Sequence, residues 1–316
     1  MSDKSHVNGN KGKSSMELIA MNHMHGWMDD PGVLCSVFRD ILGLSCEERD
    51  LTTYLGLPLL STITRKGWDS VWVEYFQELV PGALASITGP RAPRVFAVDY
   101  RVKDLDQAQK ELEAIGIART LEVPIGSTRQ FWYDPEKTFG LFIELSEFEG
   151  DDGLIKNMTP LCKPLVTPRG TLGIERLDHV HAWTTDADGA ARFYSDVFGM
   201  TTHTWIDPKN NIKIALLKAK NDPRYIELFQ PLGQDALQNI DSPRNPGIFS
   251  MNYKVEDVAR ATQELEMQGI RKVWSDNRGA VKQAMFASDR TNGVNIELSE
   301  YSGNDFIKAA GMELPA

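Results

Sequence analysis

Cysteine, histidine and long apolar runs are all scarce in this 316-residue sequence. The three cysteines, Cys35, Cys46 and Cys162, show neither CxxC nor metal-knuckle spacing, so we expect reduced thiols in a cytoplasmic protein rather than a disulfide framework. No stretch approaches the roughly 20 apolar residues that a membrane span requires. Residues 1–16 are polar, lack the apolar centre of a secretory signal, and are predicted to be a disordered tail.

Clusters of positive charge are also absent. The formal net charge is -10, and the lysines and arginines form neither a run nor a stripe. This distribution argues against nucleic acid or an anionic membrane as partner. We therefore expect a small-molecule substrate, and a homodimer stays open.

The sequence repeats itself. His23 and His25 of MNHMHGW correspond to His179 and His181 of LDHVHAW, 156 residues later, and these two motifs hold four of the six histidines. Two strand-like segments with a central glutamate recur at a separation of 153 residues, pairing Glu74 with Glu227 and Glu144 with Glu297. The nearly constant separation predicts an internal duplication over the whole chain.

Each half of the chain shows the same order of elements twice. A short apolar strand leads into an amphipathic helix that ends at glycine, and three further strands follow. The four predicted helices are PGVLCSVFRDILGL, DLDQAQKELEAIGI, GAARFYSDVFGM and VARATQELEMQGI. We therefore predict an α+β fold of four βαβββ units that form two cup-shaped modules.

A proline-rich segment marks the division between the modules. Residues 151–171 contain Pro160, Pro164 and Pro168, which disfavour a helix or a central strand and predict a linker. The remaining predicted parts are an N-terminal module at 17–150, a C-terminal module at 172–302 and a C-terminal tail at 303–316.

Strand periodicity places the two histidines of each motif on one face, because alternate side chains point the same way. Glu227 and Glu297 each lie between an isoleucine and a leucine, so each glutamate faces either outer solvent or the interior of a cup. Four glutamates at offsets that match four histidines favour the interior. Carboxylates buried together repel unless a cation neutralises them. Mixed imidazole and carboxylate ligands suit Fe, Mn, Co, Ni or Zn, so we predict one divalent transition metal in each active cup.

These features resemble the vicinal oxygen chelate superfamily, which includes glyoxalase I, methylmalonyl-CoA epimerase, extradiol dioxygenases and fosfomycin-resistance proteins. The resemblance rests on an early histidine in the first strand, helices that end in FYSDVFGM or VFRDILGL, and a closing strand that reads IEL. It covers residues 17–302 as two modules. It implies metal ligands on the first, fourth, fifth and eighth strands of a module.

Carried over by position, the resemblance implies two ligand sets: His179, Glu227 and Glu297 in the C-terminal module, and His23, Glu74 and Glu144 in the N-terminal module. The fifth strand departs from the pattern, because Ser250 and Ala97 stand where many members have histidine. The second histidine of each motif, His181 or His25, points into the same cup and is a candidate substitute. The sequence leaves open whether a cup forms within one module or across both, and whether one or both cups are active.

A fourth-strand glutamate is characteristic of the glyoxalase and epimerase branch. The resemblance therefore implies a lyase or isomerase that acts through a metal-stabilised enolate on a small oxygenated substrate, with aromatic compounds among the candidates. The implied catalytic residues, as base, ligand or proton donor, are Glu227, His181, Glu74 and His25.

Four more residues are predicted to bind substrate. Asn252 and Asp99 face the cups by strand parity, and Lys282 and Arg129 offer cations at corresponding positions of the two modules. Two alternative functions stay open. An extradiol-type ring-cleaving dioxygenase is favoured by the two-module length but lacks the fifth-strand histidine, and a metal-free ligand-sequestering protein would need no transition metal.

Overall fold

The computed structural model describes most of the chain, namely residues 16–52, 56–67, 71–88, 95–150, 153–158, 163–164, 170–238, 240 and 245–312. The predicted N-terminal tail lies outside these residues except for Met16, which is buried. Residues 313–316 of the predicted C-terminal tail also lie outside them.

Seventeen strands are present in the described part of the chain. Those of the first half are β1 (Leu18–Trp27), β2 (Ser45–Asp50), β3 (Leu59–Arg65), β4 (Trp72–Glu78), β5 (Val95–Val102), β6 (Arg119–Ile125), β7 (Thr128–Tyr133), β8 (Phe142–Glu147) and β9 (Lys163–Pro164). Those of the second half are β10 (Ile174–Trp183), β11 (Thr201–Asp207), β12 (Ile212–Lys218), β13 (Tyr225–Pro231), β14 (Gly247–Val255), β15 (Lys272–Arg278), β16 (Val281–Phe286) and β17 (Asn295–Glu300).

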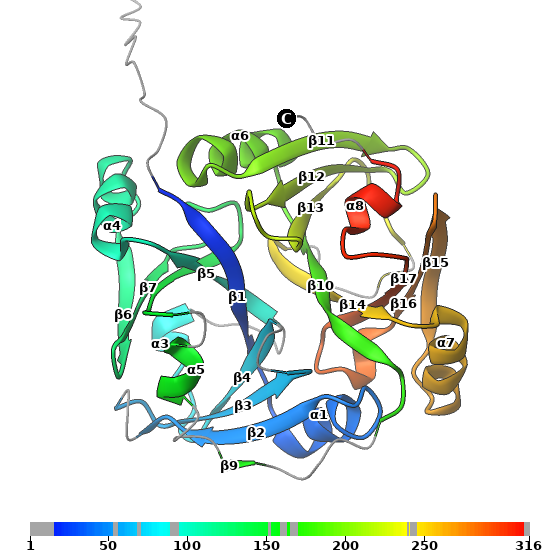
Figure 1. The fold of residues 1–316 in the computed structure, drawn as a ribbon, viewed down its shortest axis with the longest axis horizontal. Coiled ribbons are helices and arrows are strands. Elements are labelled where there is room, and N and C mark those ends of the chain that lie inside the picture. The colour runs from blue at the N-terminus through cyan, green and yellow to red at the C-terminus, as the bar shows by residue number, and fades with distance from the viewer. Residues whose placement is uncertain are drawn as a thin grey trace, which may run out of the picture.

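The strands form two curled sheets that lie side by side (Figure 1). The first sheet has the order β6-β7-β8-β5-β1-β4-β3-β2-β9, and the second has the order β11-β12-β13-β10-β14-β17-β16-β15. Apart from β9, the two orders correspond when one is reversed. The predicted α+β fold of four βαβββ units in two cup-shaped modules is confirmed.

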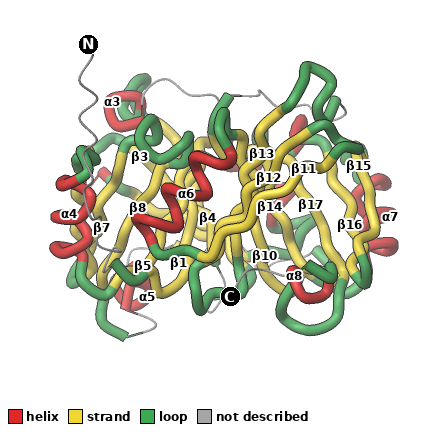
Figure 2. Tube along the Cα trace, turned by 90° about the horizontal axis from the view of Figure 1, so that it is seen from above, coloured by secondary structure: helices red, strands yellow, loops and turns green. Residues whose placement is uncertain are grey.

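The helices connect the strands of the two sheets. They are α1 (Pro31–Phe38), α3 (Ala85–Thr88), α4 (Leu105–Ala114), α5 (Gly153–Met158), α6 (Ala187–Phe198), α7 (Val258–Met267), α8 (Phe306–Ala309) and the short 3-10 helix η2 (Ser288–Arg290). Helices α4 and α7 lie at opposite ends of the molecule (Figure 2). No helix in the described residues is long and apolar enough to cross a membrane.

An aspartate begins each of the four helices that follow the first strand of a unit. The side chains of Asp30, Asp104, Asp186 and Asp257 each accept a hydrogen bond from a backbone N–H in the first turn. These caps satisfy donors that the helix itself leaves unpaired. Helix α6 ends at Gly199, whose φ of 63° is the left-handed conformation that glycine adopts without strain.

The first predicted helix is too long. Helix α1 ends at Phe38, five residues before Gly43, and the apolar side chain of Val33 within it is 51% exposed. The short helix is followed by a loop that leads into β2, so the apolar spacing at residues 41 and 42 reflects loop packing.

The predicted linker contains described structure. Helix α5 contacts β6 and β7, and β9 pairs with β2 at the edge of the first sheet. An edge strand tolerates Pro164, because one side of such a strand needs no backbone donor. The exact domain boundaries stay a prediction.

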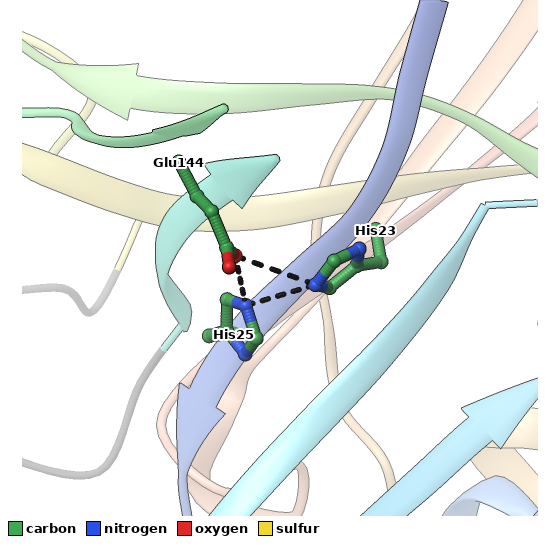
Figure 3. A group of neighbouring side chains, drawn as sticks. All are labelled: His23, His25 and Glu144. Atoms are coloured by element: carbon green, nitrogen blue, oxygen red, sulfur yellow. Dashed lines mark hydrogen bonds and ion pairs between the residues drawn. The ribbon is translucent and has the colours of Figure 1, made fainter. Parts of the chain in front are cut away.

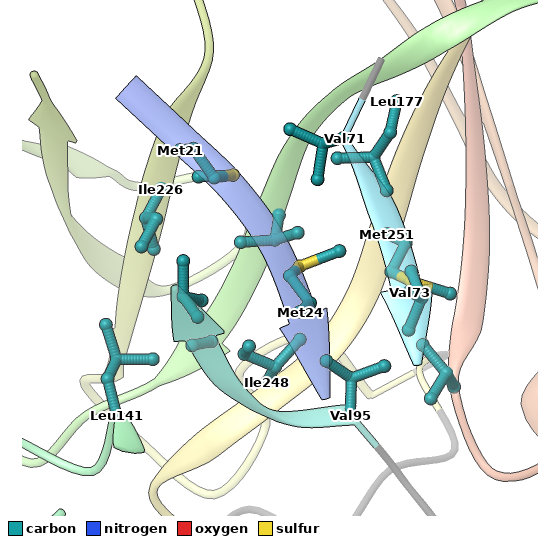
Figure 4. Packing of buried hydrophobic residues seen from close by; sticks show 14 of the residues in the cluster. Met21, Met24, Val71, Val73, Val95, Leu141, Leu177, Ile226, Ile248 and Met251 are labelled. Carbon is teal, nitrogen blue, oxygen red and sulfur yellow. The ribbon is translucent and has the colours of Figure 1, made fainter. Parts of the chain in front are cut away.

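One apolar core joins the two modules. On β1 and β10, the residues between the motif histidines, Met24 and Val180, point away from the cups into this core. Figure 4 shows side chains of both modules packed together, including Met24 and Val73 from the first and Ile226 and Met251 from the second. Because the backs of both sheets are buried in this way, the opposite faces are left to form the cup interiors.

Candidate metal centres

The strand register brings the predicted residues of the first module onto one face. His25 lies opposite Glu74 on the parallel strand β4, and His23 lies opposite Asp99 on the antiparallel strand β5. Asp99 in turn lies opposite Glu144 on β8. Residues directly opposite one another in a ladder share a face of the sheet. The first cup therefore takes these side chains from a single module.

Three donor atoms converge in the first cup (Figure 3). His23 Nε2 lies 3.0 Å from His25 Nε2 and 3.4 Å from Glu144 Oε2. His25 Nε2 also contacts Glu144 Oε2 directly. All three side chains are buried. Trp132 Nε1 donates to the other carboxylate oxygen of Glu144 at 2.7 Å, which fixes the carboxylate with one oxygen toward the histidines.

The second cup repeats this arrangement with His179, His181 and Glu297, whose donor atoms lie within 4.8 Å of one another. His181 Nδ1 lies 3.2 Å from Glu297 Oε2, and Gln283 donates to the other oxygen of Glu297. His179 Nε2 is buried and has no hydrogen-bond partner among the described residues. Both triads thus form within a module, and each gathers both histidines of its motif.

Aromatic rings from the fourth strand of each module hold the imidazoles. Centroid separations are 4.2 Å for His23 on Trp72, 5.1 Å for His25 on Phe76, 4.4 Å for His179 on Tyr225 and 4.9 Å for His181 on Phe229. Each pair is stacked, so the ring planes are fixed by packing. The two aromatic residues flank the fourth-strand glutamate at alternate positions, a repeated pattern from which the stacks could have been predicted.

The fourth-strand glutamates have different partners in the two cups. Glu74 accepts a hydrogen bond from the buried guanidinium of Arg49, and its Oε2 lies 3.7 Å from His25 Nδ1. Glu227 Oε2 lies 3.3 Å from His181 Nε2. Neither glutamate belongs to the triad of its cup. The predicted ligands Glu74 and Glu227 therefore lie beside the triads. Glu74 is near Nδ1 of His25, and Glu227 is near Nε2 of His181.

Electrostatics in the first cup favours charged forms. Burial disfavours the imidazolium of His23, but the carboxylates of Asp99 and Glu144 outweigh burial and raise its pKa to about 10. Burial likewise disfavours the carboxylate of Glu144, but His25 and His23 lower its pKa to about 2. In the second cup, burial opposes the charged form of His181, while Glu297 and Glu227 raise its pKa. Positively charged histidines and negatively charged carboxylates therefore lie close together in the cups.

The donor sets fit a divalent transition metal. Each cup offers two imidazole nitrogens and one carboxylate oxygen, the combination found in the facial triads of non-haem Fe(II) enzymes and also suited to Mn, Co, Ni or Zn. In the second cup, His179 belongs to the triad, and its Nε2 is buried without a hydrogen-bond partner among the described residues. Coordination to a metal ion would satisfy this nitrogen.

The four predicted substrate-binding residues lie in two different settings. Asp99 and Asn252 are completely buried beside the first-strand histidines, and each accepts a hydrogen bond from a serine of the last strand at 2.8 Å. Arg129 pairs with Asp106, and Lys282 pairs with Glu300; Lys282 is exposed and Arg129 is partly exposed. The structure does not bring Arg129 or Lys282 into the cups.

Two arginines that the sequence did not single out line the cups. Arg49 of β2 lies in the first cup, and Arg278 at the end of β15 lies in the second. The two arginines lie on strands that are not equivalent in the duplication, because β2 corresponds to β11 and β15 corresponds to β6. Because the duplication drew attention to repeated residues, it gave no signal for either arginine.

The second module matches a known family. Residues 178–287 match the Glyoxalase/Bleomycin resistance protein/Dioxygenase superfamily. No curated protein matches the chain in sequence.

Solved structures share the fold over most of the chain. A xylose isomerase-like TIM barrel/4-hydroxyphenylpyruvate dioxygenase fusion protein matches with a TM-score of 0.63 and 14% identity over 98% of this chain and 53% of its own, so the chain spans about half its length. A triple mutant of 4-hydroxymandelate synthase from Streptomyces coelicolor has a TM-score of 0.65 and 14% identity over 91% of this chain and 94% of its own. Methylmalonyl-CoA epimerase from Mycobacterium tuberculosis is 28% identical over 42% of this chain and 93% of its own, with a TM-score of 0.37.

The family match lies within the second curled sheet, and the likeness in fold covers both sheets. The second module therefore matches this superfamily in sequence, and the whole chain shares its two-module fold with the dioxygenase fusion protein and the synthase.

Proposed function

We propose that the chain is a divalent-metal-dependent lyase or isomerase that removes a proton next to a carbonyl group of a small oxygenated substrate. The observation that carries this proposal is the placement of Glu227. Its carboxylate is buried in the second cup beside His181, and it stands outside the triad formed by His179, His181 and Glu297. A carboxylate in that place is free to exchange a proton with a substrate.

The triads would hold the metal. In the second cup the ligands would be His179, His181 and Glu297, and in the first cup His23, His25 and Glu144. A bound divalent cation supplies a Lewis acid that polarises a substrate carbonyl and makes the neighbouring C–H more acidic.

Glu227 is the proposed base of the second cup. Burial alone would raise its pKa, but the hydrogen bond and charge of His181 lower it, so the carboxylate is deprotonated at neutral pH. His181 lies between two carboxylates, with Nδ1 toward Glu297 and Nε2 toward Glu227. The imidazole thus orients Glu227 in its ionised form.

The side chains that line the second cup determine which substrates it can bind. They include the apolar side chains of Ile212, Phe229, Ile240 and Met285. Arg278 lies in the same wall and interacts electrostatically with both Glu227 and Glu297. We propose that the substrate has an apolar body and that Arg278 faces its oxygen-bearing end.

The first cup is less suited to proton removal. Arg49 already engages Glu74 there, and both side chains are almost fully buried, with exposed fractions of 2% and 3%. Protonation of Glu74 would break this ion pair and leave the guanidinium of Arg49 buried without its charged partner. We therefore propose that the second cup carries the reaction.

A ring-cleaving dioxygenase is the second candidate. The observation that favours it is the grouping of two histidines and one glutamate in each cup, since this ligand set is typical of non-haem iron oxygenases. The second histidine of each motif supplies the imidazole that the fifth strand lacks. Cytoplasmic location and homodimer formation stay predictions.

Two assays on the same metal-loaded protein separate the candidates. Under anaerobic conditions in D2O, a lyase or isomerase exchanges the C–H next to a carbonyl, and a panel of small hydroxyketones and oxoacids followed by proton NMR would reveal that exchange. Glu227→Gln should abolish it. Oxygen uptake with catechols by the iron-loaded protein, without C–H exchange, would replace the proposal with the dioxygenase. Absence of stoichiometric metal, with no effect of chelator on thermal stability, would favour ligand sequestration.

A further inference from the structure

The first strand of each module contains an extra residue just before its first histidine. On β1, Met21 pairs with Tyr100 and His23 pairs with Asp99, so Asn22 has no partner of its own. Such a β-bulge re-aims the side chain of the extra residue, and bulges are common next to active sites. The bulge at Asn22 places its side chain beside His23, which normal alternation would not do.

Asn22, His23 and Asp99 form a hydrogen-bonded group behind the first cup. Asp99 Oδ2 lies 3.2 Å from His23 Nδ1, and it also accepts hydrogen bonds from Asn22 Nδ2 at 3.0 Å and from Ser146 Oγ at 2.8 Å. Asp99 is completely buried. The carboxylate thus lies on the side of the imidazole that faces away from Glu144.

The second module has the same bulge, with the acid in the other place. Between Leu177 and His179 the extra residue is Asp178, and its Oδ2 lies 3.2 Å from His179 Nδ1. The position opposite His179 on β14 is Asn252. The acid and the amide have therefore exchanged places between the modules, while the contact of a carboxylate with Nδ1 is the same.

Two other side chains fix the position of the Asp178 carboxylate. Arg176 Nη2 donates to Asp178 Oδ1 at 2.9 Å, and the hydroxyl of Tyr301 donates to the same oxygen. The remaining oxygen is the one that faces His179. Both oxygens of Asp178 are therefore engaged, one by Arg176 and Tyr301 and the other by His179.

A carboxylate at Nδ1 controls what the imidazole can do at Nε2. Since a carboxylate only accepts hydrogen bonds, Nδ1 carries the proton, and the lone pair of the neutral ring is then on Nε2. In the first cup, His23 Nε2 is directed at His25 and Glu144, and in the second cup His179 Nε2 is buried without a hydrogen-bond partner among the described residues. Carboxylate partners of this kind orient metal-bound histidines and raise their basicity.

We propose that Asp99 in the first cup and Asp178 in the second are positioning residues that fix the first-strand histidine as an Nε2 metal ligand, and that the acid can act from either side of the ring. This inference rests on the metal sites of the proposed function. The exchange of acid and amide provides its test, because each module shows the arrangement that the other lacks.

The experiment measures Co(II) binding by its visible absorption, one cup at a time. A Glu297→Gln chain reports the first cup, and a Glu144→Gln chain reports the second. Asp99→Asn in the first background and Asp178→Asn in the second should each weaken Co(II) binding by about 10- to 100-fold, the usual effect of removing such a partner. Asp106→Asn, an exposed acid of the first module, is the matched control and should leave binding unchanged.

Relocating the acid should restore binding. The double variant Asn22→Asp/Asp99→Asn gives the first cup the arrangement of the second, and Asp178→Asn/Asn252→Asp does the reverse. Each double variant should regain most of the affinity and the absorption spectrum of its background. A merely structural role would not predict recovery from the other side of the ring. Thermal unfolding of every variant identifies any that fail to fold, and the second cup then provides the independent pair.

The outcomes separate this inference from the proposed function. If both backgrounds bind Co(II) but the single Asp→Asn variants bind equally well, the inference alone is wrong. Weakened binding without recovery in either double variant also overturns it, because the acid would then act only in its original place. If the unmodified chain binds no Co(II), the metal sites of the proposed function fail and the inference fails with them.

Discussion

Arg49 donates a hydrogen bond to the carboxylate of Glu74 inside the first cup, and both side chains are almost completely buried. Burial alone would raise the pKa of Glu74, but the Arg49 charge and then His25 lower it, so the pair is ionic at neutral pH. Glu227, the corresponding residue of the second cup, lies beside His181 instead. The two cups share the same kind of triad but differ in the partner of the neighbouring carboxylate, which is Arg49 in the first cup and His181 in the second.

Arg49→Met should destabilise the protein strongly. The change leaves the charge of Glu74 buried without its partner, and removing one member of a buried ion pair costs about 3 to 5 kcal/mol. The double variant Arg49→Met/Glu74→Gln removes both charges and should recover most of that loss. Urea unfolding of the two variants checks this expectation, and equal stability of Arg49→Met and the unmodified chain would contradict it.

Glu227→Gln should lower turnover about 10²- to 10⁴-fold, the range for loss of a general base. Metal content should be unchanged, since Glu227 lies outside the triad. The corresponding change Glu74→Gln should have a smaller effect on turnover, because Arg49 already engages Glu74. Initial rates with matched metal analysis test the comparison. Equal losses in the two variants would refute the assignment of the reaction to the second cup.

Metal binding to the first cup should release a proton. Asp99 and Glu144 outweigh burial and raise the pKa of His23 to about 10, so in the metal-free protein His23 is protonated below that pH. A metal needs the deprotonated Nε2, and affinity should therefore rise with pH by about tenfold per unit up to that pKa. Calorimetric titration of the Glu297→Gln chain in buffers of different ionisation enthalpy measures the released proton. A binding enthalpy independent of buffer would show that His23 is already neutral.

Gly140→Ala should destabilise the contact between the modules. Gly140 has φ of +91°, and a Cβ there would overlap Pro246 of the second module. Gly82→Ala is the control, because Gly82 has φ of +85° but nothing within 4 Å of the added carbon. The control should lose about 1 to 2 kcal/mol from the backbone alone, and Gly140→Ala about 1 to 3 kcal/mol more from the overlap. Similar unfolding midpoints for the two variants would contradict the packing described here.

Much of the cup architecture was predictable because strand parity and the duplication act together. The alternation of side chains along a strand placed His23 and His25 on one face. The constant offset between the two halves singled out Glu144 as a residue that is repeated together with them. The role of the second histidine was less predictable, since the expectation of a fifth-strand ligand drew attention to Ala97. The triad depends on the strand order, in which β5 alone separates the first strand of the module from the last.

Other features could not be read from local patterns. The bulges at Asn22 and Asp178 shift the register by one residue, and such a shift depends on pairing with a strand more than 70 residues away. Arg129 and Lys282 carry the positive charge that a substrate anion would need, but they lie where their strands reach solvent. The alternation of side chains tells which face a residue is on, and it does not tell how far along the strand the cup extends. The early end of α1 could not be predicted from apolar spacing either, because the apolar residues 41 and 42 pack from a loop.

Metal analysis of purified, reconstituted protein tests the central claim most directly. The two triads predict two divalent ions per chain, with one ion lost in Glu144→Gln and the other lost in Glu297→Gln. The two single variants should each keep about one ion, and the double variant none. A chain that retains no stoichiometric transition metal, or that keeps both ions in Glu144→Gln and Glu297→Gln, would contradict the account.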